Sequence, residues 1–343
     1  SIPDLGVEWD LSERSFPGRL PFLEAEYIEA CVSRYLDDGS IAKSLIASAN
    51  RIAGNPAVVR FLWHQHYLVV QNYDKHFMKC YKFPELPALG IDAKPYYLLL
   101  AFSGVGYCGE VHKKLGVPRS ALTAVLKDFK ESVKGSVERT GFVGLAPHYS
   151  GWWQGLFNGK LYRLGRLTFL HEPYRVKAKV FENQKTKELQ FLCDDGLTFN
   201  IEGLVAFKPD EVAWTSKLIE KQNIVTGNPI SATGFAMNSE VTLPLIEWRV
   251  VVKTGDPVLG VHISAGSPLD VKECIESFAQ IIEFTKEFFP QIEFRMFVCE
   301  SWLMDPALEK IMKPESNVVQ FQKRFYLVPS IKDFEFVSIR TIF

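Results

Sequence analysis

The chain has 343 residues, which is more than one hydrophobic core usually serves, so we predict two domains. Its formal net charge of −1 argues against nucleic acid or an anionic membrane surface as the main partner. The apolar runs are too short to span a bilayer, and the first residues lack the basic start and apolar core of a signal peptide.

The cysteines and histidines indicate no metal site. The six cysteines form no CxxC pair, and with no export signal we expect reduced thiols in a cytoplasmic protein. His64 and His66 are two residues apart, so on a helix they point in different directions, which disfavours shared ligation of a metal ion.

The first half of the chain has apolar residues at helical spacing. Prolines stand at the starts of several segments and glycines at their ends. The predicted helices run over 21–39, 41–54, 56–68, 95–102 and 122–135. No strand-like alternation interrupts them, so we predict a helical N-terminal domain over residues 1–150.

A strand-rich half begins after about residue 141, where glycines and tryptophans cluster. We predict a hairpin built from strands over 174–180 and 188–192, a helix over 210–221 and a long loop over 224–237. These elements belong to a second domain predicted over 151–343.

A strand, a loop of small residues, a long helix and a second strand follow one another between residues 258 and 299. Asp270 is suited to cap the helix, and Glu273 stands three residues later, as in a capping box. This order requires a crossover, so the strands over 258–263 and 294–299 are predicted to be parallel neighbours. A phosphate-bearing cofactor can bind at such a helix N-terminus, beside an open strand edge.

Four segments of the chain resemble a group of acyltransferases. They are YRLGRLTF from Tyr162, VHI from Val261, CESWLMDPAL from Cys299 and SNVVQF from Ser316. The resemblance covers almost the whole chain. It implies an α+β fold, in which a helical N-acyltransferase N-terminal domain precedes a GNAT-like mixed α/β domain with splayed central strands.

Acyl-CoA, either acetyl-CoA or a longer acyl-CoA, is the cosubstrate that the resemblance implies. Its pantetheine arm would lie between the strands over 258–263 and 294–299, and its pyrophosphate on the loop over 264–267. Asn317, placed at the start of a predicted strand, would bind the pantetheine amides or else cap a turn. The cofactor-binding residues carried over are Val261, Ile263, Ser264, Ala265, Gly266, Ser267 and Asn317.

The proposed loop and its surroundings differ from the family pattern. The loop has no Arg or Lys, and Asp270 brings a negative charge close to the expected phosphates. The family usually has Gln and Glu at the positions of Thr168 and Leu170, which implies a different acceptor, or none, if these positions face it. Arg163 and Arg166 lie on opposite faces of a strand, so at most one of them reaches into a cleft.

His262 is the candidate general base. It ends the first buried strand beside the proposed loop, and alternation places it on one face with Val258 and Gly260. A neutral imidazole there would take the proton from an attacking amine or hydroxyl. The alternative is a strand-end histidine that hydrogen-bonds to the backbone.

Cys299 and Ser301 are the other catalytic candidates. Cys299 would accept the acyl group in a two-step mechanism, but the sequence shows no neighbour that would form its thiolate, and the alternative is an inert core thiol. Ser301 would hydrogen-bond the acceptor or the pantetheine, and its alternative role is a helix N-cap.

Our main hypothesis is an acyl-CoA-dependent acyltransferase that transfers the acyl group directly to an amine or hydroxyl of a small molecule. A backbone N–H near residues 260–262 would stabilise the oxyanion. The alternative is a non-catalytic binding protein on a GNAT scaffold that has lost cofactor binding. A DNA-binding regulator would rest on the helix–glycine–helix pattern over 109–122. In its second helix Asp128 and Glu131 offset the lysines at 127, 130 and 134, which favours a packing corner within the helical domain. The acyl chain, the acceptor and the oligomeric state stay open.

Overall fold

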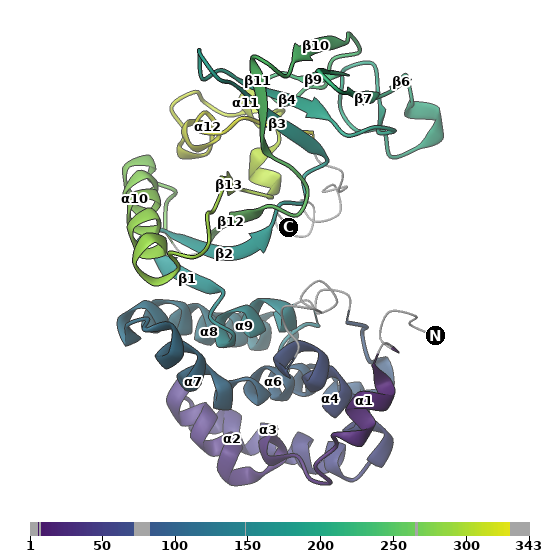
Figure 1. Cartoon of the computed structure of the whole chain (residues 1–343). Helices are drawn as coiled ribbons and strands as arrows, with labels where there is room; N and C mark the ends of the chain where they lie inside the picture. Colours follow the sequence, from purple (N-terminus) through teal and green to yellow (C-terminus); the bar gives the residue numbers. More distant parts are fainter. Residues whose placement is uncertain (1–5, 7, 72–82, 148, 265–266, 330–343) are drawn as a thin grey trace. The chain divides into compact units, whose positions relative to one another are not determined.

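The computed structural model describes residues 6, 8–71, 83–147, 149–264 and 267–329. The chain divides into two compact units, of which the first ends at Leu164 and the second begins at Gly165 (Figure 1). Gly165 has a φ of +63°, a left-handed conformation that favours glycine. The domain boundary predicted after residue 150 lies near the start of helix α9 (Tyr149–Phe157).

The first unit is helical, as predicted, and ends in one strand. Its central helix α6 is buried from Pro95 to Ser103, and α3, α4 and α9 contact it. Within the described residues, neither this helix nor any other has the length and apolar character needed to cross a membrane. The elements are α1 (Trp9–Arg14), η2 (Pro21–Leu23), α2 (Ala25–Cys31), η3 (Val32–Leu36), α3 (Gly39–Ala53), α4 (Pro56–His66), η4 (Tyr67–Gln71), η6 (Pro87–Asp92), α6 (Ala93–Ser103), α7 (Val105–Leu115), α8 (Arg119–Thr140), α9 and β1 (Leu161–Leu164).

Helix α8 extends beyond its predicted end near Gly135. It continues to Thr140 and stops where Gly141 adopts a φ of +71°. A glycine inside a helix costs about 1 kcal/mol relative to alanine. Burial of the apolar face of α8, which includes Val125, Phe129 and Val133, offsets this cost.

The second unit combines small sheets with helices, so the predicted α+β class is confirmed. Its strands are β2 (Leu167–Pro173), β3 (Ala178–Asn183), β4 (Leu189–Cys193), β5 (Thr198–Phe199), β6 (Trp214–Thr215), β7 (Leu218–Lys221), β8 (Ile224–Gly227), β9 (Pro229–Ile230), β10 (Val241–Pro244), β11 (Trp248–Val252), β12 (Pro257–Ile263) and β13 (Phe297–Val298). Its helical elements are η7 (Pro209–Glu211), α10 (Val271–Phe288), η8 (Trp302–Met304), α11 (Leu308–Ile311) and α12 (Asn317–Gln322).

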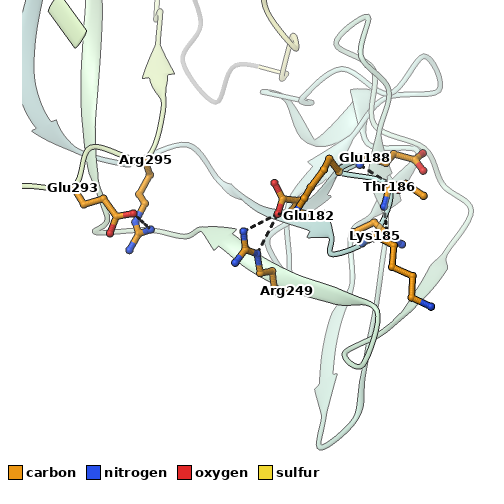
Figure 2. A network of polar contacts seen from close by, with 9 residues as sticks. Glu182, Lys185, Thr186, Glu188, Arg249, Glu293 and Arg295 are labelled. Carbon is orange, nitrogen blue, oxygen red and sulfur yellow. Dashed lines mark hydrogen bonds and ion pairs between the residues drawn. The ribbon is translucent and has the colours of Figure 1, made fainter. Parts of the chain in front are cut away.

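The predicted hairpin is formed by β3 and β4, which pair antiparallel in a sheet of order β11-β3-β4-β9. Asn183 stabilises the turn between the two strands, because its side-chain oxygen accepts hydrogen bonds from the backbone N–H groups of Lys185 and Thr186. At the same end of β3, Glu182 accepts two hydrogen bonds from the guanidinium of Arg249 on β11 (Figure 2).

Two predictions between residues 210 and 237 are wrong. The segment 210–221 is not a helix but contains part of η7 and the strands β6 and β7. The segment 224–237 is not one long loop, because it contains β8 and β9, and β8 lies between β7 and β10. Trp214 of β6 stacks on Phe199 of β5 with ring centroids 4.6 Å apart, so cross-strand packing overrides the apolar spacing that suggested a helix.

Strand β12 lies at the centre of the sheet that carries the predicted site. It pairs antiparallel with β2 along its whole length, and parallel with β13 at Leu259 and Gly260. The predicted parallel arrangement is therefore confirmed. Of the second strand predicted over 294–299, only Phe297–Val298 forms β13.

The two faces of the β2–β12 pair are packed differently. On one face, Phe169 contacts the rings of Phe278 on α10 and Phe297 on β13, each at a centroid distance of 6.0 Å. On the other face, Val258 belongs to a buried core that includes residues of β3, β4, β9 and β11. One face is thus covered by a helix and the other faces a second sheet, which fixes the direction of every side chain on these strands.

Helix α10 begins as the sequence predicts. Asp270 is its N-cap, and Asp270 Oδ1 accepts a hydrogen bond from the backbone N–H of Glu273 at 3.0 Å. This cap places the helix N-terminus directly after the loop that follows β12.

Removing the cap should lower the stability of the second unit modestly. We expect Asp270→Ala to reduce the free energy of unfolding by about 1 kcal/mol, because the Glu273 N–H loses its acceptor. Asp270→Asn keeps a side-chain oxygen and should lose much less. Urea unfolding of both variants tests this, and equal losses would show that the charge of Asp270, rather than its hydrogen bond, supports the helix.

Candidate functional site

The ladder between β12 and β13 stops before β12 ends. Leu259 N–H donates to Met296 O at 3.0 Å, and within the described residues the register ends at Gly260 and Val298. Backbone direction alternates along a strand, so the N–H groups of Val261 and Ile263 point to the same side as that of Leu259. Two donors are therefore directed toward the β13 side beyond the last paired residues.

The polar side chains of Thr168 and His262 lie on one face of the β2–β12 pair. Cross-strand register places Thr168 opposite His262 and Leu170 opposite Gly260, so these four residues share a face. Thr168 is fully buried, and Thr168 Oγ1 is 3.1 Å from Ser264 Oγ. The two positions at which the chain differs from the family pattern therefore lie beside the candidate base.

Glu172 is a site residue that the sequence analysis missed. A Cβ added to Gly260 would lie 2.1 Å from Glu172 Oε1, so this carboxylate rests directly on the glycine. Glu172 Oε2 accepts a hydrogen bond from Arg175 Nη1 at 2.8 Å. Alternation along β2 was the available signal, because Glu172 follows Thr168 and Leu170 on the same face.

His262 is neutral at physiological pH. Its side chain is half-buried, and burial, which disfavours the imidazolium, lowers the pKa of His262 from 6.5 to about 4. A neutral ring is the form that a general base needs. The same shift weakens its basicity, so the imidazole takes up a proton less readily than a solvent-exposed histidine does.

Cys299 and Ser301 follow β13 directly. Burial raises the pKa of the Cys299 thiol to about 12, so the thiolate is scarce at neutral pH, and this favours the inert interpretation. Ser301 Oγ accepts a hydrogen bond from Leu303 N–H at 3.2 Å and caps η8, which favours the N-cap interpretation.

The predicted cofactor residues have different surroundings. Val261 and Ile263 lie opposite Phe169 and Leu167 on the α10 face, so their backbones, rather than their side chains, are directed to the site. Ser264 bonds to Thr168, and Ser267 is exposed. The predicted residues Ala265 and Gly266 lie outside the described residues.

Asn317 is not at the start of a strand, so that prediction is wrong. It is the first residue of α12, and Ser316 caps this helix by accepting a hydrogen bond from Val319 N–H at 3.4 Å. The two consecutive valines suggested a strand, but the serine cap and the burial of Val319 and Phe321 stabilise a helix. Asn317 itself is exposed.

Arg163 and Arg166 have separate roles. Arg163 forms an ion pair with a carboxylate of α8. Arg166 is only 6% exposed, and its guanidinium donates to three backbone carbonyls, those of Ser264, Ser267 and Pro268, at 2.7–2.9 Å. In the described part of the chain, no carboxylate forms an ion pair with Arg166. A buried cation therefore lies under the loop that has no basic residue of its own.

His64 and His66 of the first unit contact different residues. His64 Nδ1 is 2.7 Å from Ser12 Oγ, and His66 Nδ1 is 2.8 Å from Ser103 Oγ. This agrees with the expectation that the two rings point apart. Among the described residues, no group of three or more His, Cys, Asp or Glu side chains could hold a metal ion.

A surface pocket of about 370 Å³ lies elsewhere on the second unit. Arg249 and Arg295 in its lining are ion-paired with Glu182 and Glu293, each at 2.8 Å (Figure 2). The pocket borders β11 and the segments before β12 and β13, so it is away from the end of β12 that carries His262. Its lining residues are Arg249, Val250, Val251, Lys253, Asp256, Glu293 and Arg295.

Comparison with known proteins identifies the family. Residues 161–343 match the family model described as GNAT-like C-terminal domain. The chain belongs to this family. A search of curated proteins finds no match.

Crystal structures of acyltransferases share the fold. One is an acyltransferase mutant in complex with octanoyl-CoA, with a TM-score of 0.59 and 20% identity over 92% of this chain and 73% of that chain. Another is an acyltransferase in complex with decanoyl-CoA and teicoplanin, with a TM-score of 0.59 and 20% identity over 97% of this chain and 83% of that chain. The coverage shows that the likeness includes the helical first unit.

The contact between Gly260 and Glu172 can be tested by a double-mutant cycle. Gly260→Ala should lower the free energy of unfolding by about 1–3 kcal/mol, because the new methyl group overlaps the Glu172 carboxylate. In a Glu172→Ala background the same change should cost less, by at least about 0.5 kcal/mol. Denaturant unfolding of the four proteins measures this, and equal costs in both backgrounds would place the clash elsewhere.

Proposed function

We propose that the protein is an acyl-CoA-dependent acyltransferase that transfers an acyl group directly from CoA to an amine or hydroxyl of a small molecule. The observation that carries the proposal is the direction of the Val261 and Ile263 N–H groups beyond the last β12–β13 pair. Family membership and the likeness to acyltransferases bound to octanoyl-CoA and decanoyl-CoA support it.

The pantetheine arm would lie along this side of β12. Its amides are polar and extended, and the edge of β12 beyond the last β12–β13 pair would supply hydrogen-bond partners at matching intervals. The N–H of Val261 would stabilise the oxyanion that forms when the thioester carbonyl is attacked. The Ile263 N–H would bind a pantetheine carbonyl, and Ser264, Ser267 and the N-terminus of α10 would receive the pyrophosphate.

His262 would accept the proton of the nucleophile. A neutral amine or a hydroxyl attacks the thioester carbon while its proton passes to the imidazole, directly or through a water. The carbon–sulfur bond then breaks, and the CoA thiolate leaves and takes the proton from the imidazolium. Glu172 would stabilise this imidazolium, as a carboxylate does for the histidine of other acyl-transfer sites.

Direct transfer to the acceptor assigns no catalytic step to Cys299 or Ser301. Cys299, whose thiol has a pKa of about 12, is not required as a nucleophile in this route. Ser301 is engaged as the N-cap of η8. Thr168 and Leu170, beside His262, would help to select the acceptor, and their small and apolar side chains suit a partly apolar group.

The alternative is a binding protein without catalytic activity. The carboxylate of Asp270 at the N-terminus of α10 favours it, because a negative charge there opposes phosphate binding. A protein of this kind would bind the acceptor but release no CoA thiol.

The cofactor is tested by calorimetry with acetyl-CoA, octanoyl-CoA and decanoyl-CoA. We expect at least one of them to bind with a dissociation constant near or below about 100 μM, as is usual for cosubstrates. Asp270→Asn should bind it at least as tightly, because the substitution removes a negative charge and keeps the helix cap. Absence of binding for all three would remove the cosubstrate and with it the proposed reaction.

His262→Asn tests the base. With an acyl-CoA that binds, the variant should lose about 100-fold or more in kcat while its affinity for acyl-CoA stays unchanged. With an acceptor that does not titrate between pH 4 and 8, the wild-type rate should fall near pH 4 rather than near pH 6.5, because burial lowers the pKa of His262. Release of the CoA thiol measures both effects, and an unchanged kcat would exclude His262 as the base.

A further inference from the structure

The turn that carries Arg166 is fixed to helix α10. A Cβ at Gly165 would lie 2.6 Å from Ser277 Oγ, so only glycine permits this close approach. Arg166 N–H donates to Ser277 Oγ at 2.8 Å, and Ser277 Oγ donates to Glu273 O at 2.7 Å. The backbone of Arg166 is therefore held against the first turns of the helix, and its side chain has a defined origin.

The side chain then connects both ends of the loop. Arg166 Nη1 donates to Ser264 O at 2.9 Å, Nη2 to Ser267 O at 2.7 Å and Nε to Pro268 O at 2.9 Å. Three donors of one rigid, planar group thus bind carbonyls at the end of β12 and just before the α10 cap. Such a fork restricts the loop more than a single point charge would.

These bonds orient the loop for an anion. Carbonyl oxygens that accept from Arg166 are turned toward the guanidinium, and so they are withheld from a phosphate, which they would repel. In a trans peptide the N–H points opposite to the C=O, so the Leu269 N–H is directed away from Arg166. The guanidinium of Arg166 is permanently charged, so it also brings a positive charge to carbonyls of a loop that has no basic residue of its own.

We propose that Arg166 is the positioning residue for the diphosphate group of CoA. It holds the backbone of Ser264, Ser267 and Pro268 in the conformation that receives the diphosphate, and it supplies the positive charge that the loop sequence lacks. This inference rests on the proposed function, because it assumes that the loop binds CoA. Arg166 acts through the loop backbone and does not itself contact the reacting atoms.

The test compares CoA with an S-acyl-pantetheine, which has the thioester and the pantetheine amides but no diphosphate. By calorimetry, Arg166→Gln and Arg166→Lys should each weaken CoA binding by at least about tenfold, because both lose the three-way fork. Their affinity for the S-acyl-pantetheine should stay within about threefold of the wild type. Arg163→Gln, which removes a guanidinium of the same segment that pairs with a carboxylate of α8 rather than with the loop, is the matched control and should stay within about threefold for both ligands.

Hydrogen exchange of the ligand-free proteins supplies an independent measurement. The N–H groups of Ser264, Ser267 and Leu269 should exchange faster in Arg166→Gln than in the wild type, whereas those in the middle of α10 should not. If Arg166→Gln fails to fold by circular dichroism, Arg166→Lys is judged by the same criteria.

Three results would overturn the inference: CoA binding by an Arg166 variant as tight as that of the wild type, equal losses for both ligands, or a loss in Arg163→Gln as large as that in Arg166→Gln. A wild-type protein that binds no CoA would refute the proposed function instead. In that case the exchange rates would still decide whether Arg166 positions the loop.

Discussion

The site depends on the antiparallel register between β2 and β12. This register places the aromatic side chains of β2 under α10 and places Thr168 and Glu172 on the opposite face, with His262. Because side chains alternate strictly along a strand, a slip of one residue would place Thr168 and Glu172 under α10 and turn Phe169 toward the second sheet. On its other edge, β12 pairs with β13 at Leu259 and Gly260, within the described residues.

The sequence allowed prediction of those elements whose signals are local. Helix starts, the Asp270 cap and the strand–loop–helix–strand order depend on residues a few positions apart, and the structure has them. The segment 210–221 and Asn317 were predicted wrongly, because apolar content alone does not distinguish a strand from a helix when the partner is unknown. Trp214 finds its partner on β5, and the helix at Asn317 is set by Ser316 and a buried face.

The candidate site was only partly predictable, for the same physical reason. His262 could be singled out because it ends a buried strand beside the loop, and its face followed from alternation. The contacts of Arg166 with the loop and of Glu172 with Gly260 join residues about a hundred positions apart. Neither contact has a local sequence signal, and both depend on how β2 is laid against β12.

The cysteines have a consequence for redox chemistry. In the described part of the chain, Cys31, Cys108, Cys193, Cys274 and Cys299 are free thiols, and burial raises the pKa of each to about 11 or 12. Peroxides and alkylating agents react with the thiolate, so these side chains resist both at neutral pH. A small thiol in solution will therefore react with an electrophilic dye much faster than these five cysteines do. Mild oxidants will leave the core around α10 intact.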